Sequence, residues 1–565
     1  MTRYLFRDTE SYLLMAKSKL RIIPIGGLGE IGKNMTVFEM GNDAFIIDTG
    51  IMFPANDMHG VDYIIPDFRY LQERKDLKIH AIVYTHGHED HIGAVSHVVE
   101  AFPNTPIYAT PLTAGLLEVR LKERRALDKT KINVFNSGDK LKVGPFMLES
   151  FHMCHSIPDC VGFGIYTPYG LIVYSGDYKF DNSPVDGKKP DYARLARFAS
   201  EGVTLLMAES TNADKPGWTP SETVIDDAFD RVFKKAKGRI FVATFASLIS
   251  RVQQVVNAAE RYGRKVAVAG HSMSENVKMA RRLGILNLPD SMLLDVSKLN
   301  SISDNQVVIM LTGAQGEPTA ALTKVANGEH RQLEVKPGDT IILSSHPIPG
   351  NEEFVYRTIN RLFRLGANVI YDPIEKVHVS GHASQDEMKL LLNLVKPKYF
   401  LPTHGELRHL YEHAQIAVST GVDRNNAFVV ENGTVIEMDK YGVKVGERVP
   451  GGYVFVDGSG VGDVGRAVIR DREVLAQDGF MIVSVNVDSR TGKVLGQPEI
   501  ISRGFTYLRD ADTLLEQIRN TVQDVMTNPN NKNGRRREKL QDSLSRLLYN
   551  ETKRRPMVFS IINEQ

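Results

Sequence analysis

The sequence is poor in cysteine and has no long hydrophobic run. Its 565 residues include two cysteines, Cys154 and Cys160, too few for a disulfide framework and spaced unlike a CxxC metal or redox pair. No stretch approaches the ~18 consecutive apolar residues that span a membrane. Asp8 and Glu10 interrupt the apolar run at the N-terminus, which argues against a secretory signal. We therefore expect a cytoplasmic protein that makes no membrane contact.

The sequence also lacks an excess of charge of either sign. It has 69 Lys and Arg against 68 Asp and Glu, a net charge of +1, and this balance does not by itself favour a nucleic-acid ligand. Basic residues nevertheless cluster at 120–125, 535–539 and 553–555. Each cluster taken alone is typical of a solvated helix face. With 42% hydrophobic and 24% charged residues, the chain predicts a globular protein of roughly three or four domains.

The pattern of apolar residues changes twice along the chain. Short strands joined by Gly-rich turns dominate residues 20–221, whereas helices alternate with buried strands from about 222 to 375. Motifs rich in His and Gly return at 376–440, so we expect the second region to be inserted into the first. After a Gly-rich stretch near 451–465, we expect strands at 464–502 and then two amphipathic helices separated by a turn at 528–534.

A GxGxxG pattern formed by Gly27, Gly29 and Gly32 follows the first strand. A dinucleotide site would need a helix to begin there and offer its N-terminus to a pyrophosphate. The sequence continues instead with the alternating strand pattern KNMTVFEM. We therefore interpret the glycines as a tight connection between strands.

The strongest chemical signal is the segment THGHEDHIG at residues 85–93. In an extended loop, residues two apart project to one side, so His86, His88 and Asp90 can converge, and His91 at the start of the next helix adds a further ligand. Imidazole and carboxylate groups are ligands that zinc prefers. A structural role for a cluster of this density is much less plausible than a metal site.

Three further candidate ligands stand at the ends of later strands: His155, Asp177 and His404. Each is weak by itself. Together with the first four they supply seven ligands, enough for two metal ions that share one carboxylate.

The HxHxDH motif and these three residues, in this order, resemble the metallo-β-lactamase superfamily. Glu209, His382 and His404 are similar to the three motifs of the β-CASP nucleases, whose RNA-acting members have His at the third. The dense set of motifs GGLGEIGKN, GVDYIIPD, HSIPD, TGAQGEP, PIPGNE, SGHAS, PTHGE, DGSGVGDVG, ISRGF and TKRRP resembles bacterial ribonuclease J over almost the whole chain. Two positions differ from some relatives: Glu replaces Asp at 209, and His346 stands where Ser is expected.

The resemblance implies an α/β fold: a metallo-β-lactamase αββα sandwich, an inserted β-CASP α/β domain and a small C-terminal α/β domain. The expected boundaries are an N-terminal extension (1–17), the sandwich (18–222 and 381–441), the β-CASP domain (223–380), a linker (442–463) and a C-terminal domain that forms oligomers (464–565).

The resemblance also implies roles for the site residues. His86, His88, His155 and Asp177 would hold one zinc ion, and Asp90, His91, Asp177 and His404 the other. A hydroxide shared by the two ions would attack the phosphorus, with Asp90 at the reaction centre, and His382, oriented by Glu209, would protonate the leaving 3′ oxygen. Manganese is a possible substitute for zinc, and Gly60, Asp62 and Asp457 resemble a structural calcium site.

Substrate is expected to be single-stranded RNA with a 5′-monophosphate end. Its phosphate would be bound by two loops, whose residues are Phe245, Ala246, Ser247, His378, Val379, Ser380, Gly381 and His382. Both 5′-to-3′ exonuclease and endonuclease activity would follow, in mRNA decay and rRNA maturation, by a homodimer or homotetramer, with or without a larger RNA-degrading complex.

Two alternatives remain open at this point. One is a metallo-hydrolase acting on a small ester or on DNA, against which His404 and the inserted domain count. The other is a non-catalytic partner subunit of an RNA-degrading complex, against which the presence of all seven ligands counts.

Overall fold

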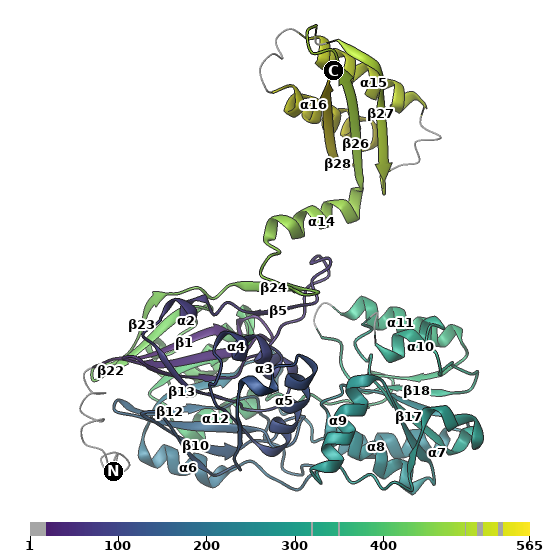
Figure 1. Ribbon diagram of the computed structural model, residues 1–565. Helices are drawn as coiled ribbons and strands as arrows, with labels where there is room; N and C mark the ends of the chain where they lie inside the picture. The colour runs from purple at the N-terminus through teal and green to yellow at the C-terminus, as the bar shows by residue number, and fades with distance from the viewer. Residues whose placement is uncertain (1–17, 318–319, 349–350, 492, 506–511, 529–534) are drawn as a thin grey trace. The chain divides into compact units, whose positions relative to one another are not determined.

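Figure 1 shows the computed structural model, which describes residues 18–317, 320–348, 351–491, 493–505, 512–528 and 535–565. The predicted N-terminal extension, 1–17, and nearly all of the predicted turn at 528–534 lie outside these residues. The chain forms two compact units: one comprises the residues up to Phe53 together with Ile64–Val454, and the other comprises Pro54–Tyr63 together with Phe455–Gln565. None of the described helices is long and apolar enough to cross a bilayer.

The first unit contains two β-sheets that face each other. The larger has the order β23-β22-β1-β3-β4-β6-β7-β8 and the smaller β20-β13-β12-β11-β10-β9. The strands of the larger are β1 (Leu20–Gly26), β3 (Met35–Met40), β4 (Asp43–Ile47), β6 (Lys78–Val83), β7 (Ile107–Ala109), β8 (Ile132–Val134), β22 (Thr434–Asp439) and β23 (Gly442–Arg448). Those of the smaller are β9 (Lys140–Val143), β10 (Phe146–His152), β11 (Val161–Thr167), β12 (Gly170–Tyr174), β13 (Val203–Glu209) and β20 (Tyr399–Thr403).

Apolar side chains from both sheets fill the space between them. Phe38 and Phe45 stack with ring centroids 4.8 Å apart, and Phe146 meets Phe45 edge-on. Helices cover the outer faces: α4 (Val95–Ala101) and α5 (Pro111–Glu123) pack on the larger sheet, and α6 (Tyr192–Glu201), α12 (Gln385–Val395) and α13 (Leu407–Ser419) on the smaller. This is the expected αββα sandwich.

The inserted region folds around a third sheet of parallel strands, in the order β16-β15-β17-β14-β18-β19. Its strands are β14 (Ile240–Ala243), β15 (Lys265–Ala269), β16 (Leu293–Leu294), β17 (Val307–Leu311), β18 (Thr340–Leu343) and β19 (Asn368–Ile370). One face is covered by α7 (Val224–Lys235), α8 (Ile249–Arg261) and α9 (His271–Arg282), the other by α10 (Ala321–Asn327) and α11 (Glu352–Arg364). The predicted alternation of helices and buried strands is therefore confirmed.

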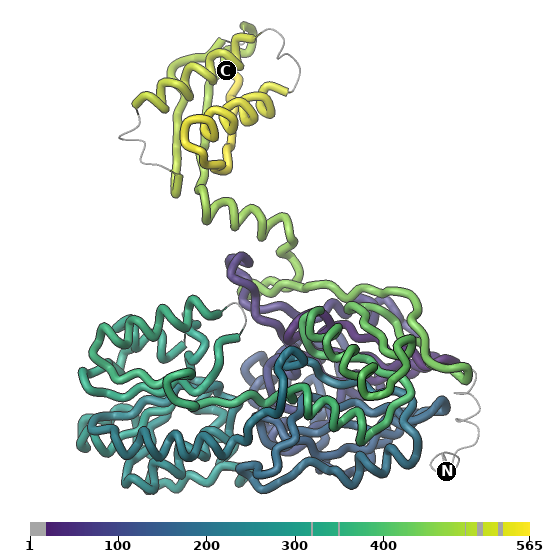
Figure 2. Tube along the Cα trace, turned by 180° about the vertical axis from the view of Figure 1, so that it is seen from behind, coloured from purple at the N-terminus to yellow at the C-terminus, as the bar shows by residue number. Residues whose placement is uncertain are grey.

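The inserted region forms a second lobe of the first unit, coloured teal in Figures 1 and 2. Helix α5 of the sandwich packs against α9 of this lobe, where a Cβ atom on Gly115 would lie only 2.5 Å from Met279 Sδ. The chain passes between the lobes twice, at 210–223 and at 371–384. Glu209 and His382 stand at these two passages.

The Gly-rich segment near the start supports the helix that follows β6. Gly27, Gly29 and Gly32 all have positive φ and lead into strand β3, so the strand connection predicted from the sequence is confirmed. Three backbone N–H groups hold the short helix α3 (Glu89–Ile92) by donating to its carbonyl groups. They belong to Asn34, Thr49 and Ile51, and the N···O distances are 3.0, 2.7 and 3.1 Å. A Cβ atom on Gly50 would lie 1.6 Å from the carbonyl oxygen of Asp90, so only glycine allows this approach.

The second unit contains a three-stranded sheet, in the order β27-β26-β28, with α15 and α16 on one face. Its elements after residue 459 are β25 (Gly460–Val461), α14 (Arg466–Asp478), β26 (Phe480–Val487), β27 (Val494–Arg503), α15 (Asp512–Thr527), α16 (Arg536–Thr552) and β28 (Met557–Glu564). The expectation of strands from 464 was wrong at its start, because α14 occupies 466–478. None of the residues of this helix is buried, so its apolar side chains belong to no core of the described residues.

Candidate metal centre

The structure brings the seven predicted ligands together. The seven fall into two groups, and within each group the potential ligand atoms all lie within 4.8 Å of one another. The first consists of His86, His88 and His155, and the second of Asp90, His91, Asp177 and His404.

Each ligand follows the carboxyl end of a strand. His86 and His88 follow β6, and His88 caps the N-terminus of α3, which carries Asp90 and His91 in its first turn. The remaining three follow strands of the smaller sheet: His155 after β10, Asp177 after β12 and His404 after β20. The site therefore forms where the ends of both sheets meet, which explains why ligands so distant in sequence converge.

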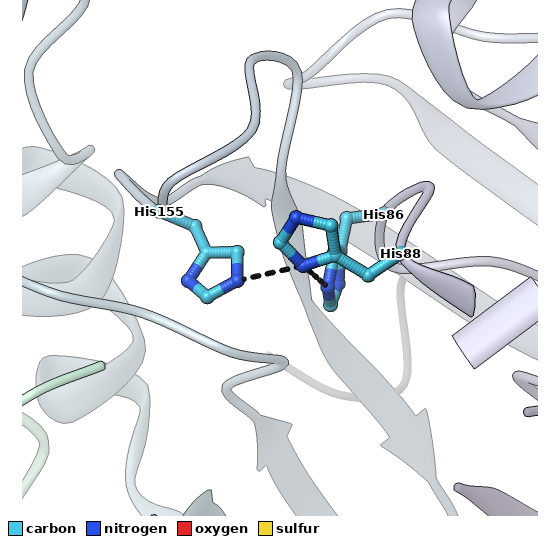
Figure 3. Close-up of side chains that lie close together, drawn as sticks. All are labelled: His86, His88 and His155. Atoms are coloured by element: carbon cyan, nitrogen blue, oxygen red, sulfur yellow. Dashed lines mark hydrogen bonds between the residues drawn. The ribbon is translucent and has the colours of Figure 1, made fainter. Parts of the chain in front are cut away.

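Three imidazole rings of the first group face one another (Figure 3). His88 Nδ1 lies 3.1 Å from His86 Nε2 and 3.1 Å from His155 Nε2. Nitrogen ligands of a tetrahedral zinc ion, each at about 2.1 Å, are separated by roughly 3.4 Å. Burial lowers the pKa of all three rings, that of His88 to about 4, so they are neutral at pH 7, the form that binds a metal.

The second group is arranged around carboxylates. His404 Nδ1 lies 2.8 Å from Asp177 Oδ1, and His404 Nε2 lies 3.3 Å from Asp90 Oδ2. Burial alone would lower the pKa of His404, but the adjacent Asp177 and Asp90 carboxylates raise this pKa to about 10. Against the same effect of burial, the pKa of His91 is raised well above its usual value by Asp177, Asp90 and Asp48. This half of the site therefore stabilises positive charge.

Asp177 Oδ2 lies between the two groups. It is 3.2 Å from His91 Nε2, 3.8 Å from His86 Nε2 and 3.9 Å from His155 Nε2. Although this oxygen is buried, it accepts no hydrogen bond from the described part of the chain. An ionised oxygen in such surroundings is costly unless a cation compensates it. The donor set and this oxygen, which accepts no hydrogen bond within the described residues, fit a pair of divalent cations that share Asp177.

Two contacts outside the ligand set fix the orientation of ligand rings. Asp48 Oδ2 lies 2.8 Å from His91 Nδ1, and the Gly381 carbonyl oxygen lies 2.7 Å from His155 Nδ1. Each leaves the Nε2 atom of the ring to face the site. Asp48 was not among the predicted residues, and its position directly after the buried strand AFII is the one weak signal for it in the sequence.

The two predicted catalytic partners of the ligands are also adjacent. His382 Nδ1 lies 3.3 Å from Glu209 Oε1 and 3.8 Å from Asp177 Oδ2. Glu209 also accepts hydrogen bonds from the backbone N–H groups of Thr211 and Ala383 at 2.9 and 3.2 Å. Its carboxylate therefore holds the segment that carries His382. His382 can also be grouped with His155 and Asp177 as a potential metal ligand.

The predicted substrate residues divide between two places. Phe245, Ala246 and Ser247 line a cavity of about 600 Å³ between α5 and the inserted lobe, together with Arg120 of the first basic cluster. Residues 378–382 lie in the second passage between the lobes. His346, which departs from the family pattern, meets the ring of His378 edge-on with centroids 4.8 Å apart, and its Nε2 lies 3.4 Å from Asp372.

The three residues predicted to bind calcium lie in the second unit. Asp62 accepts a hydrogen bond from the N–H group of Gly458 at 2.8 Å, and Asp457 pairs with Arg472 at 2.6 Å. The Arg472 guanidinium also lies against Gly60. Calcium binding at this place stays a prediction.

Comparisons with known proteins agree with this geometry. Residues 28–271 match the family model "Metallo-beta-lactamase superfamily", 237–362 "Ribonuclease J, beta-CASP domain", 366–430 "Zn-dependent metallo-hydrolase RNA specificity domain" and 467–565 "Ribonuclease J C-terminal domain". Ribonuclease J2 of Bacillus subtilis is 40% identical over 549 residues, which cover 96% of this chain and 98% of that protein. The chain belongs to the ribonuclease J family. The predicted family membership and fold class are thereby confirmed.

Other members of the ribonuclease J family are similar to the same extent. Ribonuclease J of Synechocystis is 40% identical over 96% of this chain and 86% of its own length, and Ribonuclease J 2 of Staphylococcus aureus is 38% identical over 98% and 100%. A crystal structure of a protein of unknown function from Enterococcus faecalis covers 74% of this chain and all of its own, with a TM-score of 0.51 and 14% identity. That likeness concerns the fold alone.

Replacing Asp48 by Asn tests its support of the metal centre. Asn tolerates the positive φ of 60° found at this position and keeps an acceptor for the Thr85 N–H group, so the fold should persist. Without the carboxylate behind His91, zinc affinity should fall by about ten- to a hundredfold, as measured by competition with a chromogenic chelator.

The matched control is Asp43→Asn, because Asp43 pairs with His80 at 2.6 Å on the same sheet, outside the ligand set. Equal zinc affinities of the two variants would contradict the role assigned to Asp48.

Proposed function

We propose that the chain is a zinc-dependent ribonuclease that degrades single-stranded RNA from a 5′-monophosphate end and also cleaves RNA internally. The observation that carries the proposal is the buried Asp177 Oδ2, surrounded by imidazole nitrogens and paired with no hydrogen-bond donor in the described residues. His86, His88, His155 and Asp177 would hold one zinc ion. Asp90, His91, Asp177 and His404 would hold the second, and manganese could take the place of zinc.

Divalent ions in this site would lower the pKa of a water molecule that attacks the phosphorus and would neutralise charge on the phosphate oxygens. The chain's own residues supply the rest. Part of the His382 ring is exposed, 22% of the side chain, so it can reach a substrate and protonate the leaving 3′ oxygen. Glu209 Oε1 lies 3.3 Å from Nδ1 of this ring, so its carboxylate would favour the protonated imidazole, whose Nε2–H group would donate the proton.

Several observations favour RNA over the small-ester and DNA alternatives. The relatives are named ribonucleases, and residues 366–430 match a model described as an RNA specificity domain. The cavity of about 600 Å³ adjoins the site's Gly87 and Glu89, and Arg120 and Lys324 lie in its wall beside the acids Glu123 and Glu317, so part of this wall suits a phosphate backbone. All seven ligands are present, which counts against a non-catalytic partner subunit.

We extend the proposal to the cell. Two buried free cysteines suit a reducing cytoplasm. There the enzyme would act in mRNA decay and rRNA maturation, by itself or within an RNA-degrading complex.

Product analysis on an RNA labelled at its 5′ end tests the activity. Incubation with single-stranded RNA and with DNA of the same sequence, each 5′-monophosphorylated, should degrade the RNA alone. Release of labelled mononucleotide would demonstrate cleavage from the 5′ end, and a labelled fragment would demonstrate internal cleavage. Equal degradation of both polymers, or of neither, would refute the proposal.

Replacing His382 by Ala separates proton transfer from metal binding. The variant should keep its zinc, because the two ligand groups do not need His382, yet turnover should fall by about a hundredfold or more. Zinc content is measured by elemental analysis and turnover with labelled RNA. His152→Ala is the control, since its partly exposed ring only contacts the Lys188 carbonyl at 3.2 Å. Loss of zinc from H382A would show that His382 is a ligand instead.

We also propose that the second unit forms a homodimer or homotetramer. The sheet face that α15 and α16 do not cover presents Ile482 between Ile501 and Phe559 in neighbouring strands. Ile501 and Phe559 are 40% and 41% exposed. Apolar side chains grouped on one open sheet face favour a protein interface.

A charge placed on this face tests the interface. Phe559→Asp should reduce the mass measured by gel filtration with light scattering to that of one chain, because an unpaired carboxylate cannot be buried between subunits. Tyr441→Asp, at an apolar side chain that is 83% exposed in the first unit, should leave the oligomer intact. A wild-type protein with the mass of a single chain would rule the proposal out.

A further inference from the structure

Three buried charged side chains connect the metal centre to the inserted lobe. Glu222 lies between Lys179 and Arg251: its Oε1 is 3.3 Å from Lys179 Nζ, and its Oε2 is 2.6 Å from an Arg251 guanidinium nitrogen. The side chains of Lys179 and Arg251 are 1% and 0% exposed. Lys179 follows the ligand Asp177 by two residues, whereas Arg251 lies in the first turn of α8 in the other lobe.

A contribution to the free energy of unfolding does not account for the presence of this ion network. Taking three charges out of water costs about as much as their mutual attraction returns, and buried ion pairs are often no better than apolar groups of the same size. Arg251 is moreover the largest of the fully buried side chains among the described residues. A role in fixing a specific backbone conformation accounts better for the network.

Both cations of the network hold carbonyl groups of the segment 377–382. Arg251 donates to the Val377 carbonyl oxygen at 2.9 Å, and Ser344 Oγ donates to the same oxygen at 2.6 Å. Lys179 Nζ donates to the Ser380 carbonyl oxygen at 3.2 Å. Two carbonyls at opposite ends of a short loop are therefore turned toward one buried set of charges.

The direction of these carbonyls fixes the direction of the N–H groups. In a trans peptide the N–H group of the following residue points opposite to the carbonyl, so the N–H groups of His378 and Gly381 point away from the network. Within the described part of the chain, none of the N–H groups of residues 378–381 donates to an acceptor. Unpaired backbone N–H groups on neighbouring residues are donors available to an anion.

We propose that Lys179, Glu222 and Arg251 are positioning residues, which hold the loop 377–382 so that its free N–H groups bind the terminal phosphate of a 5′-monophosphorylated RNA. This inference rests on the proposed preference for that RNA end. It concerns residues that do not touch the substrate but act through the loop. The network also links the two lobes, because Lys179 of the sandwich holds one end of the loop and Arg251 of the inserted lobe holds the other.

The test compares RNA of one sequence with a 5′-monophosphate or a 5′-hydroxyl end. The readout is the ratio of kcat/KM for the two substrates, which a general loss of stability does not change. Arg251→Lys keeps the charge but cannot donate at once to Val377, Ser344 and Glu222. The ratio should fall by about tenfold, the effect of losing one hydrogen bond to a charged group. Ser344→Ala removes the second donor to Val377 and should lower the ratio in the same direction.

Arg239→Lys is the matched control. Arg239 is also a buried arginine of the inserted lobe, and its partner Asp339 is buried as well, but it makes no contact with the loop. Its variant should keep the wild-type ratio.

The outcomes separate this inference from the proposal on which it rests. A wild-type ratio near one would overturn the preference for 5′-monophosphate and the inference together. A high wild-type ratio that R251K and S344A both retain would overturn the inference alone. If R251K does not fold, the ratio measured for S344A decides.

Discussion

The carboxylate of Asp177 sets the conditions for the rest of the first unit. One of its oxygens is buried among imidazoles and receives no hydrogen bond from the described residues, an arrangement that costs free energy unless positive charge is supplied. Strands from both sheets end around it, so the sandwich determines the spacing of the ligands. The ligand chemistry of the site thus follows from one requirement: a compact negative centre that cations must satisfy.

Around this centre, local sequence, strand pairing and supporting side chains each determine a different part of the site. Local sequence supplies His86, His88, Asp90 and His91, while the pairing of distant strands brings the other ligands within reach. Orientation then comes from groups behind the ligands, Asp48 among them. The inserted lobe adds the cavity, and the segment that returns from it adds the loop with its unpaired N–H groups.

Much of this could be predicted from the sequence, for reasons that differ between elements. The HxHxDH cluster is local and dense, and the strands of the inserted lobe are buried apolar runs, so both were evident. Asp48 was missed because a lone acid after a strand carries no distinctive spacing. Helix α5 was not expected because it is buried on most sides, including at Gly115. Helix α14 was not expected because none of its residues is buried in a core.

The two passages of the chain between the lobes have a mechanical consequence. Glu209 ends the last strand before the first passage, and His382 stands at the end of the second, with 3.3 Å between their side chains. Any displacement of the inserted lobe relative to the sandwich would be transmitted through both of these connections, so it would change the separation of the Glu209 and His382 side chains.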